Sequence, residues 1–538
     1  MNSSERISPI ESSTLQIQVI FRTKKSPQPS QIHKVYVFNM NGNQKIYTFA
    51  EIAKHNTYES SWCVVRGKVL DLTNFIKRHP GGSQIILASG IDATVLVDSY
   101  HPNGVPSAIL DKLTIGAVEK SVSYYEFDDR PEAFYPTLKR RVHNHLAALG
   151  VPRRGSKEIQ IKATVIFTVL FLTYIMGWIV SDMSLGLRIF FAFLHGVAAA
   201  HVGMSVMHDA NHAAFSTSSR VNSIFGATLD LIGASGCVWS FQHVVSHHAF
   251  TNLETRTQLH LENHRNLKGG SEKKDDMDLQ LSHENDVDVF SSFPFIRMHP
   301  GDERHWYHRY QQFYAPILFG LLTLAKVFFS DLHFYFSTRV SHVDMTPRMS
   351  LWSENFVFLG FKVLNIFFMC ILPYYLHGPK VAILLFVVAH FTAGFYLSVC
   401  FLVSHISEGA LFYRGGQQLG LKGADILNEQ DPISTQKVHP RDWAACQAGS
   451  TVNWAAESWF WGAFSGGLNT QLEHHLFPGV NHTAYRFMPP IVREVCDEFG
   501  VPYVEVPNLF SAIVLCMKYL RDLGIEDNPQ SGPSKVIT

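Results

Sequence analysis

Four long apolar runs, arranged in two close pairs, set the strongest limit on how this chain of 538 residues can fold. The runs are residues 163–180, 189–207, 355–376 and 381–404. An α-helix rises 1.5 Å per residue, so about 20 apolar residues cross the roughly 30 Å hydrocarbon core of a bilayer. Each run is close to that length, and only a short polar turn separates the members of each pair. We therefore expect two transmembrane hairpins, each returning the chain to the side of the membrane that it left.

Two further features concern the placement of these hairpins. A fifth apolar run, residues 313–325, is shorter, and crossing the membrane there would separate the histidine clusters described below. We therefore expect this run to be interfacial or buried. The basic segment Lys139-Arg140-Arg141 precedes the first long run, so the positive-inside rule predicts that the N-terminal region is cytosolic. Both hairpins then end on the cytosolic side.

Histidine is concentrated in short clusters just beyond the apolar runs. The clustered residues are His208, His212, His243, His247, His248, His405, His474 and His475, accompanied by Gln471. With 28 histidines in 538 residues, a given position is His about one time in twenty, so several ordered clusters do not arise by chance. Imidazole suits iron, zinc and copper, and a structural zinc site needs only four ligands. The inventory therefore predicts two metal ions with open coordination positions.

The spacing within each cluster predicts how the rings are directed. His208 and His212 are four residues apart, so on a helix they share a face and can reach one metal, and His243 and His247 repeat that spacing. His248 lies well round an ideal helix from His243, so we expect the backbone to depart from ideal helical geometry there. His474 and His475 are adjacent, so their rings point in different directions and can serve different metals.

Other polar residues near the clusters receive supporting roles. Three histidines inside apolar runs are expected to be hydrogen-bonded interior residues rather than ligands: His195, His201 and His390. Asp209 and Glu473 are candidates to fix histidine tautomers through hydrogen bonds. The strongly polar segment 254–288 is expected to be a solvated loop without chemistry.

A second cofactor motif lies upstream, in residues 45–120. His79-Pro80-Gly81-Gly82 by itself is a turn that carries a histidine. Together with Trp62, Phe75, Ala93 and Tyr100-His101, it resembles the cytochrome b5 family along about 75 residues. The resemblance implies a small α+β domain that binds haem b, with His79 and His101 as the axial ligands. Such a haem has no open position for oxygen and acts as an electron carrier.

The clusters HDANH, HVVSHH and QLEHH together resemble the membrane fatty acid desaturases. The b5-like domain and Gln471, which replaces the first His of the usual third cluster, are similar to the front-end subgroup. The resemblance implies two non-haem irons held by the eight clustered histidines. His405 matches a further ligand of the family, and Gln471 either ligates through its carbonyl oxygen or orients a water. It implies no catalytic residue beyond these metal ligands.

The implied activity is insertion of a cis double bond between an existing double bond and the carboxyl end of a 20- or 22-carbon polyunsaturated acyl chain. Flanking segments such as Asp442-Trp443-Ala444-Ala445 resemble Δ5 and Δ4 desaturases of algae and diatoms. The resemblance implies O2 as co-substrate and electrons from NADH through a separate cytochrome b5 reductase. The substrate is an acyl-CoA or a membrane phospholipid, and the location is the endoplasmic reticulum membrane.

Aromatic residues are candidates for the walls or mouth of an acyl tunnel, and membrane-interface aromatics are an equally good interpretation of the same residues. They are Trp239, Phe241, Trp454, Trp459, Phe460 and Trp461.

These observations predict a multi-domain chain. A b5-like α+β domain is followed by an all-α, four-span membrane desaturase domain with a cytosolic helical cap. The predicted boundaries are a flexible N-terminus at 1–44, the b5-like domain at 45–120, a linker at 121–160, the desaturase domain at 161–525 and a flexible C-terminus at 526–538.

Alternative functions remain at this stage. The nearest are a Δ6 or Δ8 acyl desaturase, a sphingoid-base desaturase or a diiron hydroxylase on the same scaffold. A non-enzymatic membrane haem carrier leaves the clustered histidines unexplained, and a zinc hydrolase would need an HExxH motif, which this sequence lacks.

The charge balance and the cysteines exclude two other classes of protein. Lys+Arg and Asp+Glu both number 45, and no basic face of the kind that binds nucleic acid stands out. The seven cysteines form no CxxC pair and predict no disulfide framework.

Overall fold

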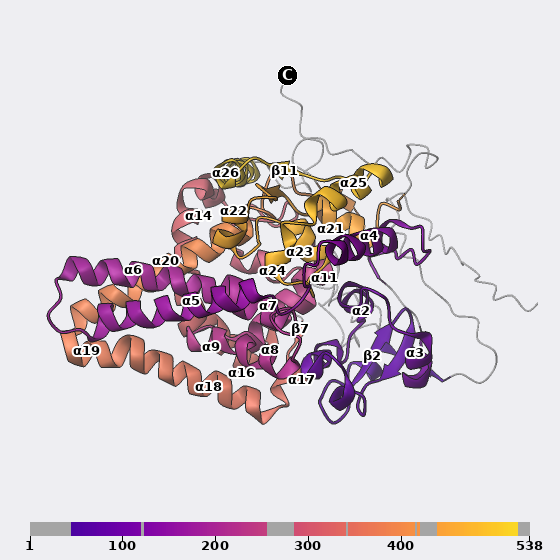
Figure 1. Cartoon of the computed structure of the whole chain (residues 1–538), viewed down its shortest axis with the longest axis horizontal. Coiled ribbons are helices and arrows are strands. Elements are labelled where there is room, and N and C mark those ends of the chain that lie inside the picture. The colour runs from indigo at the N-terminus through magenta and orange to yellow at the C-terminus, as the bar shows by residue number, and fades with distance from the viewer. Residues whose placement is uncertain are drawn as a thin grey trace, which may run out of the picture.

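A computed structural model describes residues 45–119, 123–254, 285–340, 343–414, 417–419 and 438–525. The predicted flexible ends, 1–44 and 526–538, lie outside the described residues. A long array of helices extends from one side of the molecule, and the small N-terminal domain and a group of shorter helices gather at the other (Figure 1). All seven cysteines are free thiols, as predicted.

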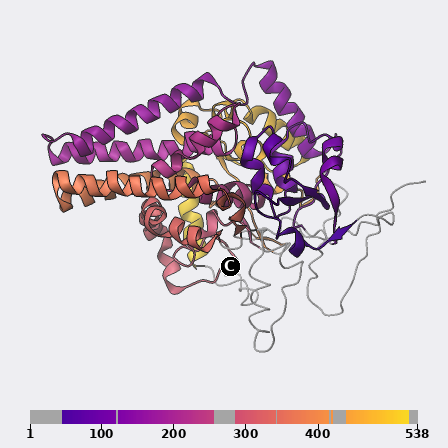
Figure 2. The same ribbon diagram turned by 90° about the horizontal axis from the view of Figure 1, so that it is seen from below.

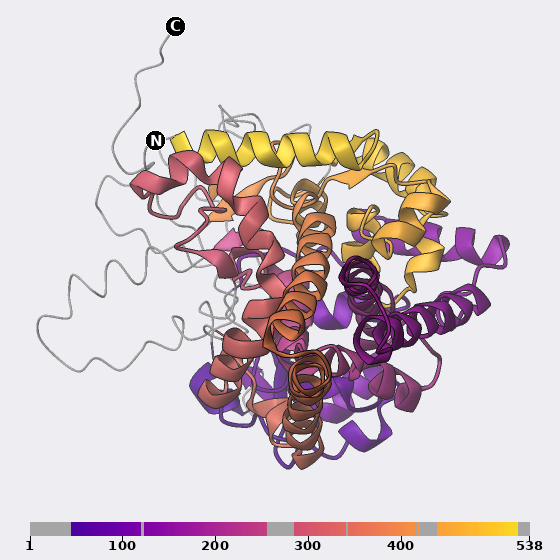
Figure 3. The same ribbon diagram turned by 90° about the vertical axis from the view of Figure 1, so that its left-hand side faces the viewer.

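Four helices are long and apolar enough to cross a membrane, which agrees with the prediction. They are Lys157–Ile179, Leu185–Asn211, Trp352–His377 and Pro379–Leu402. The second begins as α6 (Leu185–His201) and the fourth is α20 (Pro379–Leu402), and these two pack closely together. Gly196 permits the contact, because a Cβ there would lie 2.4 Å from the backbone oxygen of Ala389. Viewed along the array, the long helices are seen end-on (Figure 3).

Two further pairs of helices are bent. The run at 313–325 falls in α14 (Gln311–Gly320) and α15 (Leu322–Ala325), where the pair Trp306–Gly320 and Leu322–Ser337 bends by 58°. The other pair, Ser219–Leu231 and Gly236–Phe250, bends by 113°. If each bent pair is one span, the count of candidate spans rises to six. The interfacial or buried position of the run at 313–325 therefore stays a prediction.

The N-terminal domain combines a small sheet with short helices, as predicted. Its strands are β1 (Ile46–Tyr47), β2 (Trp62–Val65), β3 (Lys68–Asp71) and β4 (Thr114–Val118), in the order β1-β4-β3-β2. β1 is parallel to β4, and the other pairs are antiparallel. The helices α2 (Thr94–Tyr100) and α3 (Ser107–Leu113) lie between β3 and β4 in the sequence.

The predicted helical cap is built from segments far apart in the sequence. One buried apolar cluster joins α4 (Phe134–Ala148), α21 (Trp443–Gly449), α23 (Gln471–Leu476) and α25 (Pro489–Phe499). The region 121–160, which the sequence predicts to be a linker, therefore contains a packed helix. Arg141 of α4 forms ion pairs with Glu494 and Glu498.

The N-terminal domain is docked directly onto the helical domain (Figure 2). Leu87 of the small domain belongs to a buried cluster that also contains Val238, Val245 and Met345. Polar contacts add to this surface: the Asn56 amide donates to the Asp344 carboxylate at 3.1 Å. The docked arrangement brings the haem motif close to the histidine clusters.

Candidate functional site

Tertiary folding divides seven of the clustered histidines into two buried groups. The first group contains His208, His212, His243 and His474, and the second contains His247, His405 and His475. Within each group the potential ligand nitrogens all lie within 4.8 Å of one another. The adjacent His474 and His475 fall into different groups, as their directions predict. This arrangement offers two neighbouring metal positions.

The second cluster contributes to both groups because its backbone is not an ordinary α-helix. Residues Ser240–His247 form a π-helix, which continues into α11 (His248–Phe250). A π-turn contains more residues than an α-turn and redirects the side chains that follow it. His243 therefore enters the first group and His247 the second, so the shared metal position that their four-residue spacing predicts is wrong. The predicted departure from ideal helix at His248 is confirmed.

Each of the seven grouped histidines is held by a partner at Nδ1. The partners are Asp209 for His208 at 3.5 Å, Tyr100 for His212 at 2.5 Å, Asp288 for His243 at 2.9 Å, Asp286 for His247 at 3.0 Å, Ser450 O for His405 at 3.3 Å, Tyr485 for His474 at 3.1 Å and Gln447 for His475 at 2.9 Å. A hydrogen bond at Nδ1 fixes the ring orientation and leaves Nε2 available to a metal. The set is thus oriented as metal ligands require.

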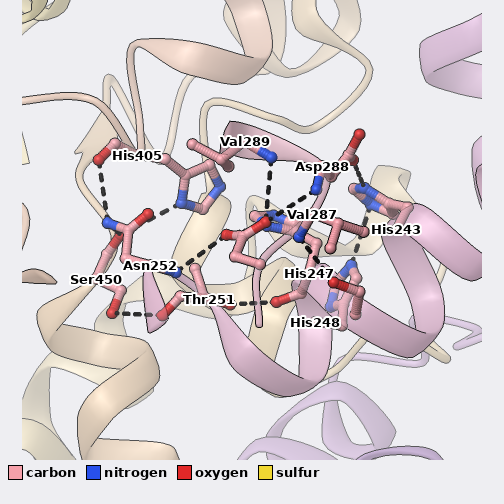
Figure 4. Close-up of polar contacts among 12 residues, drawn as sticks. His243, His247, His248, Thr251, Asn252, Val287, Asp288, Val289, His405 and Ser450 are labelled. Atoms are coloured by element: carbon pink, nitrogen blue, oxygen red, sulfur yellow. Dashed lines mark hydrogen bonds and ion pairs between the residues drawn. The ribbon is translucent and has the colours of Figure 1, made fainter. Parts of the chain in front are cut away.

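Asp286 and Asp288 are functional residues that the sequence analysis missed. They lie at the end of the polar segment 254–288, which was expected to have no chemistry, and that expectation is wrong for these two residues. Residues 255–284 of the segment lie outside the described structure. The Asp286 carboxylate also accepts from the backbone N–H of Asn252 and Val289 (Figure 4). From the sequence, the Asp-Val-Asp pattern indicates only an acidic loop. Its histidine partners lie some forty residues away, so local spacing does not reveal them.

His248 and Gln471 lie between or beside the two groups. The His248 ring centroid is 4.4 Å from that of His474 and 4.5 Å from that of His475, so it lies close to both groups. The amide end of Gln471 lies 2.9 Å from Nε2 of His405 and 3.3 Å from Nε2 of His475. All nine predicted metal-site residues therefore converge on one buried region.

The unpartnered atoms of this region match the chemistry of a metal site. Nε2 of His208, His212, His247 and His474, and Oε1 of Gln471, are buried without a hydrogen-bond partner among the described residues. Several unsatisfied acceptors in one buried place carry a high desolvation cost unless something binds them. Burial lowers the pKa of His474 and His475, with neighbouring histidines adding to the shift. Both rings are therefore neutral, as ligands must be.

The two predicted supporting carboxylates behave differently. Asp209 contacts Nδ1 of His208 and also accepts from the backbone N–H and ring of His482, each at 2.9 Å. Glu473 accepts instead from the Asn453 amide at 2.8 Å and the Tyr503 hydroxyl at 3.2 Å. The prediction holds for Asp209 and is wrong for Glu473, because helix α23 turns Glu473 away from the rings of its neighbours.

Of the three interior histidines, two have the expected hydrogen bonds. Nδ1 of His195 lies 3.1 Å from the Leu170 carbonyl oxygen, and Nε2 of His201 lies 3.2 Å from the Tyr396 hydroxyl. The His390 ring instead packs against Phe386, and its buried Nε2 has no partner among the described residues. The predicted hydrogen bond is therefore absent at that nitrogen.

The haem motif forms a matching pair of histidines. The ring centroids of His79 and His101 lie 6.1 Å apart, with an interplanar angle of 62°. Nδ1 of His79 lies 3.3 Å from the carbonyl oxygen of Gly82, and Nδ1 of His101 lies 2.9 Å from that of Val97. Both Nε2 atoms are thereby left for an iron between the rings, the arrangement that axial haem ligation needs. Burial lowers the pKa of both residues.

A mainly apolar cavity of about 170 Å³ reaches the first histidine group. His208, His243 and Asp288 line it near the rings, and Trp239 both lines it and stacks on His243 at 4.4 Å. Its walls include Leu322. The cavity therefore offers apolar space beside the first histidine group.

Only Trp239 among the predicted tunnel aromatics lines this cavity. Phe241 and Trp454 are buried in apolar cores, and Trp461 packs against Trp454. Trp459 and Phe460 are exposed, at 60% and 57%. These five residues therefore do not line this cavity, and the exposure of Trp459 and Phe460 agrees with the alternative interpretation as membrane-interface aromatics.

Comparisons with known proteins agree with both sites. The sequence profile described as "Fatty acid desaturase" matches residues 183–507, and that of the "Cytochrome b5-like Heme/Steroid binding domain" matches residues 48–119. An "Acyl-lipid (8-3)-desaturase" of Physcomitrium patens is 34% identical, covering 90% of this chain and 92% of the relative. The "Delta(5) fatty acid desaturase A" of Dictyostelium discoideum is 32% identical, with coverages of 89% and 94%. An "Acyl-lipid (8-3)-desaturase" of Mortierella alpina is 29% identical, with coverages of 89% and 98%.

Proposed function

The chain belongs to the fatty acid desaturase family as a front-end acyl-lipid desaturase with a fused cytochrome b5-like domain, and we propose that it inserts a Δ5 double bond into a 20-carbon polyunsaturated acyl chain. The observation that carries this proposal is the pair of neighbouring histidine groups, the first of which contributes His208 and His243 to the lining of the apolar cavity. Relatives named Delta(5) desaturases support the position of the double bond. A Δ4 double bond in a 22-carbon chain is the second candidate.

The metal ions proposed for the two groups are irons. His208, His212, His243 and His474 would hold one, and His247, His405 and His475 the other, with His248 between them and Gln471 beside the second. Removal of hydrogen from unactivated carbon is beyond any side chain, and the bound metals supply the oxygen chemistry that this reaction requires. The amide oxygen of Gln471 would complete the second set, since that set has only three grouped histidines.

The protein's own contribution at this centre is orientation. Asp286 and Asp288 accept from the Nδ1–H groups of His247 and His243, which keeps each Nε2 directed inward. The apolar cavity excludes water and holds the acyl chain beside the first group. Positioning the chain selects the carbons that react.

The b5-like domain would hold one haem b between His79 and His101, and that haem supplies electrons one at a time. A separate cavity of about 500 Å³ lies beside His101, and Lys139, Arg153 and Arg154 contribute to its lining. These cations suit the carboxylate groups of a haem. Haem affinity would then depend on both domains.

Several partners and the location follow from the same proposal. The electrons would come from NADH through a cytochrome b5 reductase, with O2 as co-substrate. The candidate spans and the basic residues before the first of them support a multi-pass protein of the endoplasmic reticulum membrane, with both sites on the cytosolic side. The acyl carrier would be a membrane phospholipid, as the acyl-lipid names of the relatives suggest, and acyl-CoA is the alternative.

Feeding experiments in yeast test this function. Cells expressing the chain receive single 18-, 20- or 22-carbon polyunsaturated acids, and the double bonds in the products are mapped. A new Δ5 bond in a 20-carbon product supports the proposal, and analysis of phospholipid and CoA pools shows which carrier gains it first. New bonds only at Δ6 or Δ8, a hydroxylated product or a modified sphingoid base would replace the proposal with one of the alternatives.

A further inference from the structure

Tyr100 connects the two cofactor sites. It immediately precedes His101 in the sequence, and its hydroxyl lies 2.5 Å from Nδ1 of His212 in the first histidine group. One residue of the small domain therefore contacts the candidate metal centre directly, while its neighbour faces the haem position.

The end of helix α2 explains how adjacent residues reach two sites. The helix ends at Tyr100, and His101 leaves it with φ −112° and ψ 87°, outside helical geometry. The His101 ring then lies beside that of His79, while the Tyr100 ring lies nearly parallel to that of His212, with an interplanar angle of 17° and centroids 6.1 Å apart. Their side chains therefore serve different domains.

The docking surface holds this contact in place. Leu87 is buried among apolar residues of the helical domain, and the Lys139 ammonium donates to the backbone oxygen of Asp98 in α2. Gly479 packs beside the tyrosine, since a Cβ built there would lie at an ordinary van der Waals distance, 3.7 Å, from the Tyr100 ring. The tyrosine is thus part of a packed interface rather than a side chain on a loose tether.

The hydrogen bond also has a defined direction when His212 binds a metal. Nε2 of His212 is buried and unpartnered among the described residues, and His212 belongs to the first histidine group, so with Nδ1 bonded to Tyr100 this nitrogen is the one left for a metal. The protonated Nδ1 then donates to the Tyr100 oxygen. Bonds therefore run from the imidazole of His101 through the backbone to the phenol, and one hydrogen bond completes the path to His212.

We propose that Tyr100 is the residue that couples electron transfer between the two sites. This inference rests on the proposed function, since it requires haem at His79 and His101 and iron at His212. In each transfer one electron leaves ferrous haem, which becomes ferric, and reduces the metal centre by one electron. Two such transfers, with NADH as the original reductant, supply two electrons. These electrons, with two protons from solvent and the two hydrogens removed from the substrate, reduce one O2 to two waters. Tyr100 also positions His212, and the two roles make different predictions.

The test uses the purified full chain carrying haem and iron, with the variant Tyr100→Phe. Phenylalanine keeps the ring and the interface packing and removes only the hydroxyl. The haem is reduced with NADH and reductase and then mixed with O2 and a polyunsaturated acyl substrate, and its reoxidation is followed by stopped-flow absorbance. We expect the reoxidation rate to fall by roughly tenfold, the effect of losing one hydrogen bond from the transfer step. Tyr47→Phe is the matched control, because Tyr47 packs on Trp62 in the sheet of the same domain.

Three further measurements separate coupling from structural support. Because loss of the Nδ1 partner of His212 should weaken iron binding, Tyr100→Phe is loaded with excess ferrous iron before the measurement. Its haem content, haem midpoint potential and iron content should then equal those of the unmodified chain. A small reduced mediator that delivers electrons directly to the metal centre should restore product formation. An unchanged reoxidation rate would overturn the proposal, as would loss of iron or a mediator-driven rate that falls equally. If the unmodified chain neither reoxidises its haem with substrate nor forms a double bond, the proposed function itself fails.

Discussion

The side-chain amide of Gln471 lies 2.9 Å from Nε2 of His405, inside the second histidine group. The amide of Gln471 contributes one oxygen and one nitrogen, and a rotation of the amide by half a turn exchanges their places. The buried Oε1 has no partner among the described residues. Gln471 therefore has the position and the atom needed to complete a metal site that has only three grouped histidines.

Replacement of Gln471 should impair desaturation in two ways. Gln471→Ala removes the oxygen donor, and Gln471→His introduces a bulkier nitrogen donor that changes coordination and potential. We expect each to reduce product yield roughly tenfold or more, as loss of an oriented group at a metal site does. Product yield per amount of protein in a feeding assay is the measurement, and Gln160→Ala, at an exposed position on α5 (Lys157–Tyr174), is the control. Near-normal turnover by both Gln471 variants would remove Gln471 from the metal model.

Loss of one axial ligand should abolish haem binding. His79→Ala removes one of the two neighbouring histidine rings in the small domain, and we expect no low-spin haem spectrum from the full chain. The membrane helices and the iron content should be retained, because His79 lies outside both histidine groups. Visible absorbance of reduced protein is the measurement. A persistent low-spin spectrum would show that His79 is not the ligand.

The metal content of the purified chain should be about two non-haem irons and one haem, as the two histidine groups and the His79–His101 pair require. Removal of iron with a chelator should abolish product formation without removing the haem, and ferrous iron should restore it. Elemental analysis and haem absorbance provide the measurements. Zinc in stoichiometric amount, with activity independent of iron, would refute the assignment.

The carboxylates missed in the sequence should be needed for metal binding. Asp286→Asn and Asp288→Asn each weaken the acceptor at Nδ1 of a ligand histidine, and we expect a 10- to 100-fold loss in iron affinity or activity. Iron content during titration with a chelator is the measurement. Asp182→Asn is the control, because this exposed residue changes charge in the turn that joins the first two spans. Unchanged iron retention would show that the two carboxylates do not support the centre.

Filling the apolar cavity should block the substrate without disturbing the cofactors. Leu322→Trp inserts a larger side chain into a wall of the cavity of about 170 Å³, and we expect product formation to fall at least tenfold, the equivalent of about 1.4 kcal/mol in the barrier. Haem and iron should be unchanged. Leu321→Trp provides the matched control, since Leu321 is 39% exposed and does not line the cavity. Equal effects of the two variants would show that the cavity is not the acyl site.

The sequence by itself determined the features that depend on neighbouring residues. The lengths of the apolar runs predicted the four long helices, because the bilayer thickness and the helical rise are constant. The spacing of His208 and His212, and the adjacency of His474 and His475, indicated which rings fall in one group and which in different groups, whereas the equal spacing of His243 and His247 did not.

Tertiary structure alone decided the contacts between distant segments. The partnership of Asp286 with His247 spans 39 residues, and that of Tyr100 with His212 spans 112. Local spacing carries no signal for such pairs, because they form only when the packing of whole elements brings their surfaces together. The packing of whole elements also explains why Trp239 lines the cavity whereas Trp459 is exposed. The sequence therefore predicted the candidate metal and haem ligands, and the fold determined how these residues are oriented and connected.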